Sequence, residues 1–177
     1  MSRRLAEGFD GAAHPDAAPA VDAVIALGAN LGDRRETLAA AATALEHLPL
    51  VSAVRMSEPM ESVAVTLAGP DPDAPGYLNA VAIVTTRLAP TVLLSYLHAI
   101  EDQHGRVRRE RWGDRTLDLD LIAYGDVVCD TPTLTLPHPR AAERDFVLAP
   151  WLSIDPDASV VGAGRVADLL KRLGDAP

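Results

Sequence analysis

Two aspartates separated by a single residue, Asp118 and Asp120, directly follow an arginine-rich segment. The residues around them have the alternating pattern of a β-strand, in which successive side chains point to opposite faces. Both carboxylates therefore share one face, while Leu117, Leu119 and Leu121 share the other. One face is predicted to be core and the other a site. Carboxylates on a rigid face suit Mg²⁺, which is usually held by one or two carboxylates while substrate phosphates complete its octahedron.

The segment before these aspartates supplies positive charge. Five of the fifteen arginines fall between residues 106 and 115, whereas Lys171 is the only lysine. A guanidinium group is planar, permanently charged and able to bind two phosphate oxygens at once. A surface that serves solubility alone more often mixes lysine with arginine. The combination implies chemistry on a polyphosphate, although a solvated charged loop before an edge strand is the plain alternative.

Length and composition limit the other possibilities. A chain of 177 residues suits one domain with a substantial core, and its net charge of −9 argues against nucleic acid or an anionic membrane as the general partner. The lone cysteine, Cys129, excludes an internal disulfide and favours a reducing cytoplasm. Residues 1–20 lack hydrophobic periodicity and are expected to be a disordered leader before a single domain at residues 21–177.

Hydrophobic periodicity predicts the elements that must position these groups. Strands are expected at residues 23–27, 51–56, 78–86 and on the aspartate segment up to residue 124, and helices at 34–48 and from Pro90 to before Gly105. The order βαββαβ is typical of ferredoxin-like α+β folds, in which helices pack on an antiparallel sheet. A long loop is expected at residues 58–76, and beyond residue 124 a short hairpin and helices at 141–152 and 166–173.

Six motifs occur in a fixed order along the chain. They are Leu27-Gly28-Ala29-Asn30-Leu31-Gly32, Tyr77-Leu78-Asn79-Ala80, Gly105-Arg106-Val107-Arg108, residues 111–120, Leu136-Pro137-His138-Pro139-Arg140 and Glu143-Arg144-Asp145-Phe146. Together they resemble the hydroxymethyl-dihydropterin pyrophosphokinases of folate biosynthesis over about residues 22 to 160. The resemblance implies transfer of the β,γ-diphosphate of ATP to 6-hydroxymethyl-7,8-dihydropterin, with release of AMP, by an enzyme expected to be a cytoplasmic monomer.

The resemblance also implies roles for particular side chains. Asp118 and Asp120 would be ligands of two Mg²⁺ ions and, with Arg106 and Arg115, the catalytic group. The residues near ATP would be His98, Glu101, Arg108, Trp112, Leu121, Thr135, His138 and Arg144. The residues near the pterin would be Gly28, Ser57, Pro59, Met60, Tyr77, Asn79 and Phe146. Stacking suits a flat heterocycle, and an asparagine offers both a donor and an acceptor to its amide-like edge.

Several of these residues also have ordinary structural interpretations. His98 lies on an otherwise exposed helix face and could be solvated, while Glu101 could simply pair with an arginine. Phe146 could belong to the core, Tyr77 could be a strand-edge residue, and His138 could terminate a strand.

The sequence departs from the family pattern near the pterin side. Arg55 stands where many relatives have tyrosine, and Glu61 stands where glycine is expected. The stretch from residue 62 to residue 76 is also longer than expected.

Two other functions compete with this one. A Mg²⁺-dependent nucleotidyltransferase would also place metal-binding aspartates on an antiparallel sheet, but it would release pyrophosphate. An RNA-binding module of ferredoxin-like topology would need a basic face and exposed aromatic side chains, whereas this chain is acidic and 4% aromatic. A P-loop kinase is excluded because the chain has no G-x-x-x-x-G-K-[ST] motif.

Overall fold

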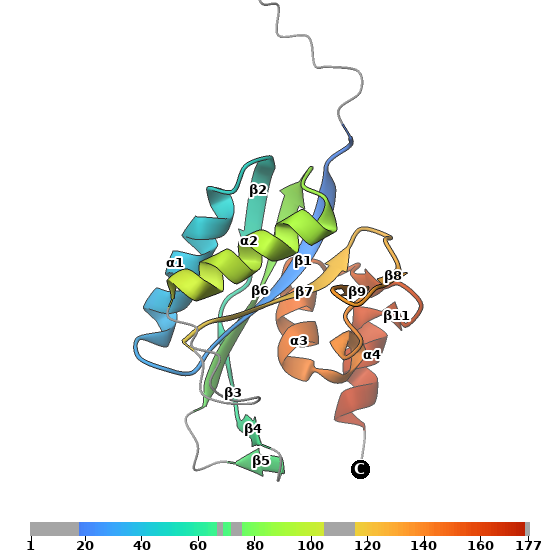
Figure 1. Ribbon diagram of the computed structural model, residues 1–177. Helices are drawn as coiled ribbons and strands as arrows, with labels where there is room; N and C mark the ends of the chain where they lie inside the picture. Colours follow the sequence, from blue (N-terminus) through green and yellow to red (C-terminus); the bar gives the residue numbers. More distant parts are fainter. Residues whose placement is uncertain (1–17, 67–68, 72–75, 105–115, 176–177) are drawn as a thin grey trace, which may run out of the picture.

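A central antiparallel sheet organises the computed structural model, which describes residues 18–66, 69–71, 76–104 and 116–175 (Figure 1). The strands run in the order β2 (Val51–Met56), β6 (Tyr77–Thr86), β1 (Val21–Ala29) and β7 (Asp118–Tyr124). A further strand, β3 (Met60–Ser62), pairs with the beginning of β6. The last strand of the order, β7, has β1 as its only strand neighbour within the described part of the sheet.

The connections match the predicted ferredoxin-like fold. Helix α1 (Arg34–Glu46) joins β1 to β2, and α2 (Pro90–Gln103) joins β6 to β7, so the core follows the order βαββαβ. Each of these helices begins where the sequence indicates. The Asp33 carboxylate caps α1 by accepting a hydrogen bond of 3.0 Å from the Glu36 amide. Pro90 occupies the first turn of α2, where its missing N–H costs nothing.

One face of the sheet is buried by α1 and α2. Leu38, Ala41 and Leu45 of α1 and Leu93, Leu97 and Ile100 of α2 pack in one core with the sheet residues Ile25, Leu27, Leu119 and Leu121. The leucines that flank the two aspartates therefore point into this core, as the alternation predicts.

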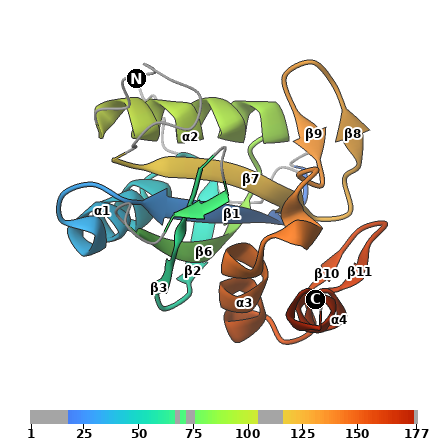
Figure 2. The same cartoon turned by 90° about the horizontal axis from the view of Figure 1, so that it is seen from below.

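The opposite face carries a second core. Val24, Val81, Ile83 and Ile122 pack against α3 (Asp145–Ile154) and α4 (Val166–Gly174), which lie on the other side of the sheet from α2 (Figure 2). The prediction that one face is core and the other a site is therefore too simple. A register shift between β1 and β7 lies next to Val24, and both Ile122 and Ala123 belong to this second core. The aspartates project to this face, but they do not belong to its core cluster.

The region between β2 and β6 contains more regular structure than expected. The predicted loop at 58–76 is wrong in part, because β3 and the short pair β4 (Ala64–Thr66) and β5 (Gly69–Asp71) fall within it. The pairing of β3 with β6 comes from contacts between distant residues, which composition alone does not reveal.

The C-terminal elements differ in detail from their predicted bounds. The helix expected at 141–152 is divided into a 3₁₀ helix at Ala141–Glu143 and α3. Strands β8 (Cys129–Asp130) and β9 (Thr135–Leu136) form the predicted hairpin, and β10 (Ser159–Val160) and β11 (Gly164–Arg165) form another. Among the described residues, no helix combines the length and the apolarity needed to cross a bilayer.

Candidate active site

A single row of paired residues crosses four strands and contains both a metal candidate and pterin candidates. Gly28 of β1 pairs with Asp118 of β7 on one side and with Asn79 of β6 on the other. Asn79 pairs in turn with Met60 of β3. Directly paired residues of antiparallel strands project to the same face. The metal candidate Asp118 and the pterin candidate Asn79 therefore share one face, with Cα atoms about 10 Å apart across two strand spacings.

Gly28 keeps the middle of this row open. A Cβ atom at Gly28 would lie 3.3 Å from Oδ1 of Asn79 and 3.9 Å from Cδ1 of Tyr77. The first of these distances is tighter than an ordinary van der Waals contact, so a larger residue would force Asn79 to move. The absence of a side chain at Gly28 thus leaves room on β1 for the side chains of Asn79 and Tyr77.

A cleft of about 350 Å³ lies along the outer edge of β7. Three separate segments line it: α2 contributes Leu94, His98 and Glu101, β7 contributes residues 118–121, and the region of the β8–β9 hairpin contributes residues 131–135, His138 and Pro139. The structure therefore brings together His98, Glu101, Leu121, Thr135 and His138, all predicted to lie near ATP, with both aspartates. His98 is half-buried and lines the cleft, so it does not lie on an exposed face.

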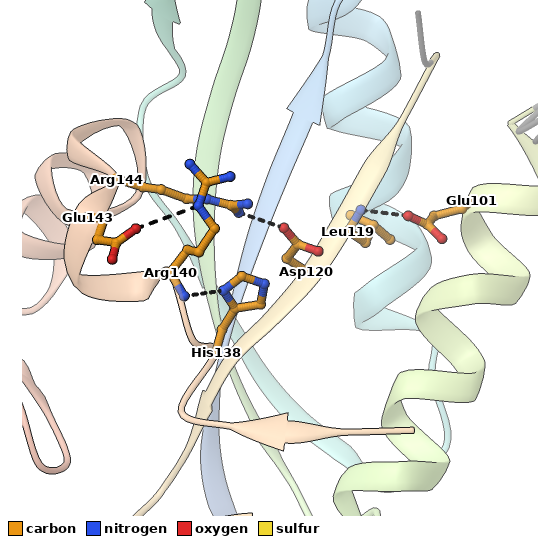
Figure 3. A network of polar contacts seen from close by, with 7 residues as sticks. All are labelled: Glu101, Leu119, Asp120, His138, Arg140, Glu143 and Arg144. Carbon is orange, nitrogen blue, oxygen red and sulfur yellow. Dashed lines mark hydrogen bonds and ion pairs between the residues drawn. The ribbon is translucent and has the colours of Figure 1, made fainter. Parts of the chain in front are cut away.

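Glu101 links α2 to the edge strand β7 through a hydrogen bond. The residue is 1% exposed, and its Oε1 accepts a hydrogen bond of 2.9 Å from the Leu119 backbone amide (Figure 3). A carboxylate that accepts from a backbone N–H makes a strong, charge-assisted bond. This contact fixes the position of β7 relative to the cleft wall formed by α2.

A network of charges surrounds Asp120, which lines the cleft. Nη1 of Arg144 lies 2.9 Å from Oδ2 of Asp120, and the two side chains are 17% and 34% exposed (Figure 3). Arg140 lies beside this pair, with its Nε 3.6 Å from Oε2 of Glu143. Arg140 was not among the predicted ligands, although it belongs to the quoted motif that ends at residue 140.

The surroundings of His138 favour its neutral form. Burial lowers the pKa of His138, the positive charges of Arg144 and Arg140 lower it further, and Asp120 and Asp118 oppose them. The Arg140 amide donates a hydrogen bond of 3.2 Å to Nδ1 of His138. A ring that accepts at Nδ1 while neutral carries its proton on Nε2. His138 is therefore a neutral donor near pH 7, next to the aspartates.

The two aspartates fit Mg²⁺ as a partial ligand set. Both are half-buried and project to one face, which suits a metal ion that takes one or two carboxylates. Among the described residues, no group of three or more His, Cys, Asp or Glu side chains could hold a metal ion. The donor set thus fits an ion that arrives with a phosphorylated substrate better than a permanently bound one.

The pterin candidates are held mainly by neutral hydrogen bonds. Ser57 is buried; its amide donates to the Val81 carbonyl at 2.9 Å, and its Oγ accepts from the Val81 amide at 3.0 Å. Nδ2 of Asn79, also buried, donates to Oγ of Ser62 at 2.7 Å. Ser62 was missed by the sequence prediction, because its role depends on the pairing of β3 with β6.

The remaining pterin candidates lie around this pair. Pro59, Met60 and Tyr77 are half-buried. Phe146, at the start of α3, is partly buried against the second core, and the guanidinium carbon of Arg144 lies 5.8 Å from its ring centroid. Phe146 therefore contacts the core and also borders the charged network. The predicted residues Arg106, Arg108, Trp112 and Arg115 lie outside the described part of the chain.

The departure at Arg55 has a structural partner at the end of α3. Nη1 of Arg55 donates to the Ile154 carbonyl at 3.2 Å, and Nη2 lies 3.8 Å from the Asp22 carboxylate. This side chain therefore connects β2 with the end of α3.

Comparison with known proteins agrees with this arrangement. Residues 24–156 match the sequence model of the family described as 7,8-dihydro-6-hydroxymethylpterin-pyrophosphokinase (HPPK). The 2-amino-4-hydroxy-6-hydroxymethyldihydropteridine pyrophosphokinase of Haemophilus influenzae is 39% identical over 160 residues, which cover 88% of this chain and 94% of the relative. The protein of the same name from Pseudomonas aeruginosa is 41% identical over 151 residues, which cover 82% of this chain and 88% of the relative.

A solved structure shares the fold at much lower sequence identity. The wild-type HPPK-DHPS of Plasmodium falciparum with pteroate aligns with a TM-score of 0.66 at 13% identity, covering 86% of this chain and 42% of that one. The present chain thus corresponds to less than half of that larger protein, and the likeness concerns the fold. Together with the two bacterial relatives, the match over residues 24–156 shows that the chain belongs to the 7,8-dihydro-6-hydroxymethylpterin-pyrophosphokinase family.

Proposed function

We propose that the protein transfers the β,γ-diphosphate of ATP to the hydroxymethyl group of 6-hydroxymethyl-7,8-dihydropterin, giving AMP and the pterin diphosphate for folate synthesis. Membership of the family supports the reaction. The observation that carries it at the site is the row Asp118–Gly28–Asn79, which puts a metal candidate and a pterin candidate on one face, two strands apart.

The reaction exchanges one phosphorus–oxygen bond for another. The pterin hydroxyl oxygen attacks the β-phosphorus of ATP, and the bond from this phosphorus to the oxygen shared with the α-phosphate breaks. AMP leaves with that oxygen, and the hydroxyl proton is released. Such a transfer depends on in-line positioning and on stabilisation of charge more than on a strong general base. A site that fixes two substrates on one rigid sheet face supplies the positioning.

The nucleotide would occupy the cleft at the edge of β7. The neutral His138 ring would donate from Nε2 to an oxygen of ATP, and Arg144 would exchange part of its contact with Asp120 for a phosphate oxygen. Thr135 and His98 line the same cleft and offer further polar contacts. The proposed roles of Arg106 and Arg115 in catalysis, and of Arg108 and Trp112 in ATP binding, rest on the sequence motifs.

Asp118 and Asp120 would hold two Mg²⁺ ions together with the triphosphate. When bound, the ions would neutralise the charge that develops on the phosphates. Asp120 would then share its carboxylate between a metal ion and Arg144, which is 2.9 Å away.

The pterin would lie over Gly28, between the neighbourhood of Tyr77 and Asn79 on one side and Phe146 on the other. Asn79 already donates to Ser62, so its Oδ1 and its second N–H are the groups it could turn toward the ring. Backbone groups near Ser57, Pro59 and Met60 would complete the recognition.

A single assay tests the reaction. Purified protein is incubated with ATP, Mg²⁺ and 6-hydroxymethyl-7,8-dihydropterin, and the nucleotide products are separated. AMP and a diphosphorylated pterin in equal amounts are expected, and a metal chelator should abolish both. Pyrophosphate with an adenylylated pterin would instead indicate the nucleotidyltransferase reaction, and no pterin-dependent product would refute the proposal.

We further propose that the enzyme acts as a cytoplasmic monomer whose partners are ATP and the pterin rather than nucleic acid or a membrane. The acidic net charge of −9 and the lone Cys129 support this setting. Sedimentation at micromolar concentration should give the mass of one chain, and a stable dimer would contradict it.

A further inference from the structure

We propose that Arg34 is a positioning residue for the pterin. Its side chain links the start of helix α1 to strand β3 and to the residue that precedes strand β6, and these two contacts keep Asn79 and Tyr77 in register with β3. The inference rests on the proposed reaction and concerns a residue outside the six motifs. In Figure 1 the beginning of α1 and strand β3 lie at the same end of the sheet.

The guanidinium group of Arg34 makes two contacts with residues distant in the sequence. Nη1 donates a hydrogen bond of 2.7 Å to the backbone carbonyl of Gly76, 42 residues away. Nη2 donates to Oε1 of Glu61 at 3.1 Å, 27 residues away. Glu61 is the middle residue of β3, and Gly76 immediately precedes β6. The Arg34 side chain therefore contacts the chain segment at both of its ends, at β3 where it leaves the sheet and at Gly76 where it returns to the sheet.

These two contacts border the pairs that carry the pterin candidates. The pairing of β3 with β6 consists of Met60 with Asn79, Glu61 with Leu78, and Ser62 with Tyr77. Glu61 lies at the middle pair, and Gly76 lies one residue beyond the last pair. The bond from Asn79 to Ser62 depends on the same register. If β3 frays from β6, Asn79 loses its partner and Tyr77 loses the strand opposite it.

Arg34 lies on a helix that is firmly anchored in the core. Arg34 is the first residue of α1, directly after the capping residue Asp33, and the helix is anchored in the first core through Leu38, Ala41 and Leu45. A short strand such as β3, with three residues, has few hydrogen bonds of its own to keep it paired. We therefore expect the contacts from Arg34, on a helix anchored in the core, to contribute a large share of the order of β3.

The two contacts differ in expected strength. The side chain of Glu61 is 73% exposed, so water and salt screen its ion pair with Arg34, whose side chain is 31% exposed. The bond to the Gly76 carbonyl is part-buried and shorter. We therefore expect the carbonyl contact to carry most of the effect, and Glu61→Gln, which keeps an acceptor oxygen, to stay close to wild type.

The experiment measures binding of each substrate separately. The fluorescent pterin 6-hydroxymethylpterin is titrated into the protein with Mg²⁺ and a non-hydrolysable ATP analogue, and KM for ATP and for the dihydropterin is measured by AMP release. Arg34→Ala should weaken pterin binding and raise its KM roughly 5- to 20-fold, as expected for loss of charge-assisted hydrogen bonds, with ATP affinity within about twofold. Arg34→Lys, which can form one bond but not both, should fall between.

The neighbouring residue provides a matched control. Arg35→Ala removes the same charge from the same turn of α1, and Arg35 is exposed. It should leave the affinities of both substrates unchanged. Thermal unfolding of every variant is followed in parallel, and Arg34→Lys retains a cationic side chain if the alanine variant does not fold.

The outcomes separate this inference from the proposed reaction. If the wild type binds no pterin and releases no AMP, both proposals fall. If the wild type is active but Arg34→Ala binds the pterin as tightly as the wild type does, only the positioning role of Arg34 is refuted. Arg34→Lys replaces the alanine variant in this comparison if the alanine variant does not fold. Equal losses for ATP and pterin would also overturn the positioning role, because they would indicate general destabilisation.

Discussion

The two halves of the candidate active site are built in different ways. On the proposed nucleotide side, at the edge of β7, opposite charges from separate segments meet, such as Asp120 with Arg144. On the proposed pterin side, neutral groups of adjacent strands form hydrogen bonds with one another, such as Asn79 with Ser62.

This difference predicts different behaviour on binding. A charged side chain that pairs with another can exchange that partner for a phosphate or a metal ion, so the nucleotide side is suited to rearrange. The bonds on the pterin side are tied to the strand register, so that side is already ordered before a ligand arrives. Changes on the nucleotide side should therefore affect mainly turnover, and changes on the pterin side mainly affinity.

The largest effect is expected from the aspartates. Asp120→Asn should lower turnover by about 100-fold or more with little loss of folding, because it weakens a proposed ligand of Mg²⁺, whose positive charge would stabilise the transition state. Steady-state AMP release and thermal unfolding measure the two quantities. Asp118→Asn should behave alike, whereas Asp126→Asn, in the exposed turn after β7, should be nearly silent. Near-normal turnover of Asp120→Asn would remove the metal assignment.

Gly28→Val should have the next largest effect, this time on the pterin. A Cβ at this position lies 3.3 Å from Oδ1 of Asn79, and the larger side chain must displace that group. Overpacking of about 2–3 kcal/mol corresponds to roughly 30- to 150-fold weaker pterin binding. Gly174→Ala, where a Cβ would meet no atom within 4 Å, serves as the control. Calorimetric titration that shows equal losses for ATP and pterin would count against the division into two sides.

Phe146→Ala should weaken pterin binding by roughly 1–3 kcal/mol through lost stacking and burial, and ATP binding by less. Tyr77→Ala should change the same affinity in the same direction. Because Phe146 also packs against the second core, chemical denaturation must accompany the titration. A large fall in the free energy of unfolding with unchanged pterin affinity would assign Phe146 to the core alone.

The smallest effect concerns the pH dependence of stability. The pKa of His138 is lowered from 6.5 by burial and by Arg144 and Arg140, so the unfolded chain binds a proton more readily than the folded one. The contribution of His138 to stability is therefore lost as the pH falls below about 6.5, and it is constant above neutrality. Unfolding by urea between pH 5 and pH 8 should show that the free energy of unfolding falls less steeply with decreasing pH in His138→Asn than in the wild type. Identical pH profiles for the two proteins would contradict this account.

The sequence by itself determined the local features and the family. Alternation placed Asp118 and Asp120 on one face, and the capping residue Asp33 and Pro90 marked where the two core helices begin. These predictions succeeded because each depends on residues a few positions apart. The motifs indicated the family, and hydrophobic periodicity indicated the ferredoxin-like order of elements, because both are local patterns that can be followed directly along the chain.

Only the tertiary structure decided which distant residues meet. The pairing of Gly28 with both Asp118 and Asn79 depends on strand register across the sheet. The bond of Glu101 to β7 and the two contacts of Arg34 join residues 18, 27 and 42 positions apart. Such contacts form because buried apolar faces fix the strands relative to one another, and a one-residue slip would turn every side chain to the other face. Local propensity carries no information on that choice, which is why β3 and the second core were missed.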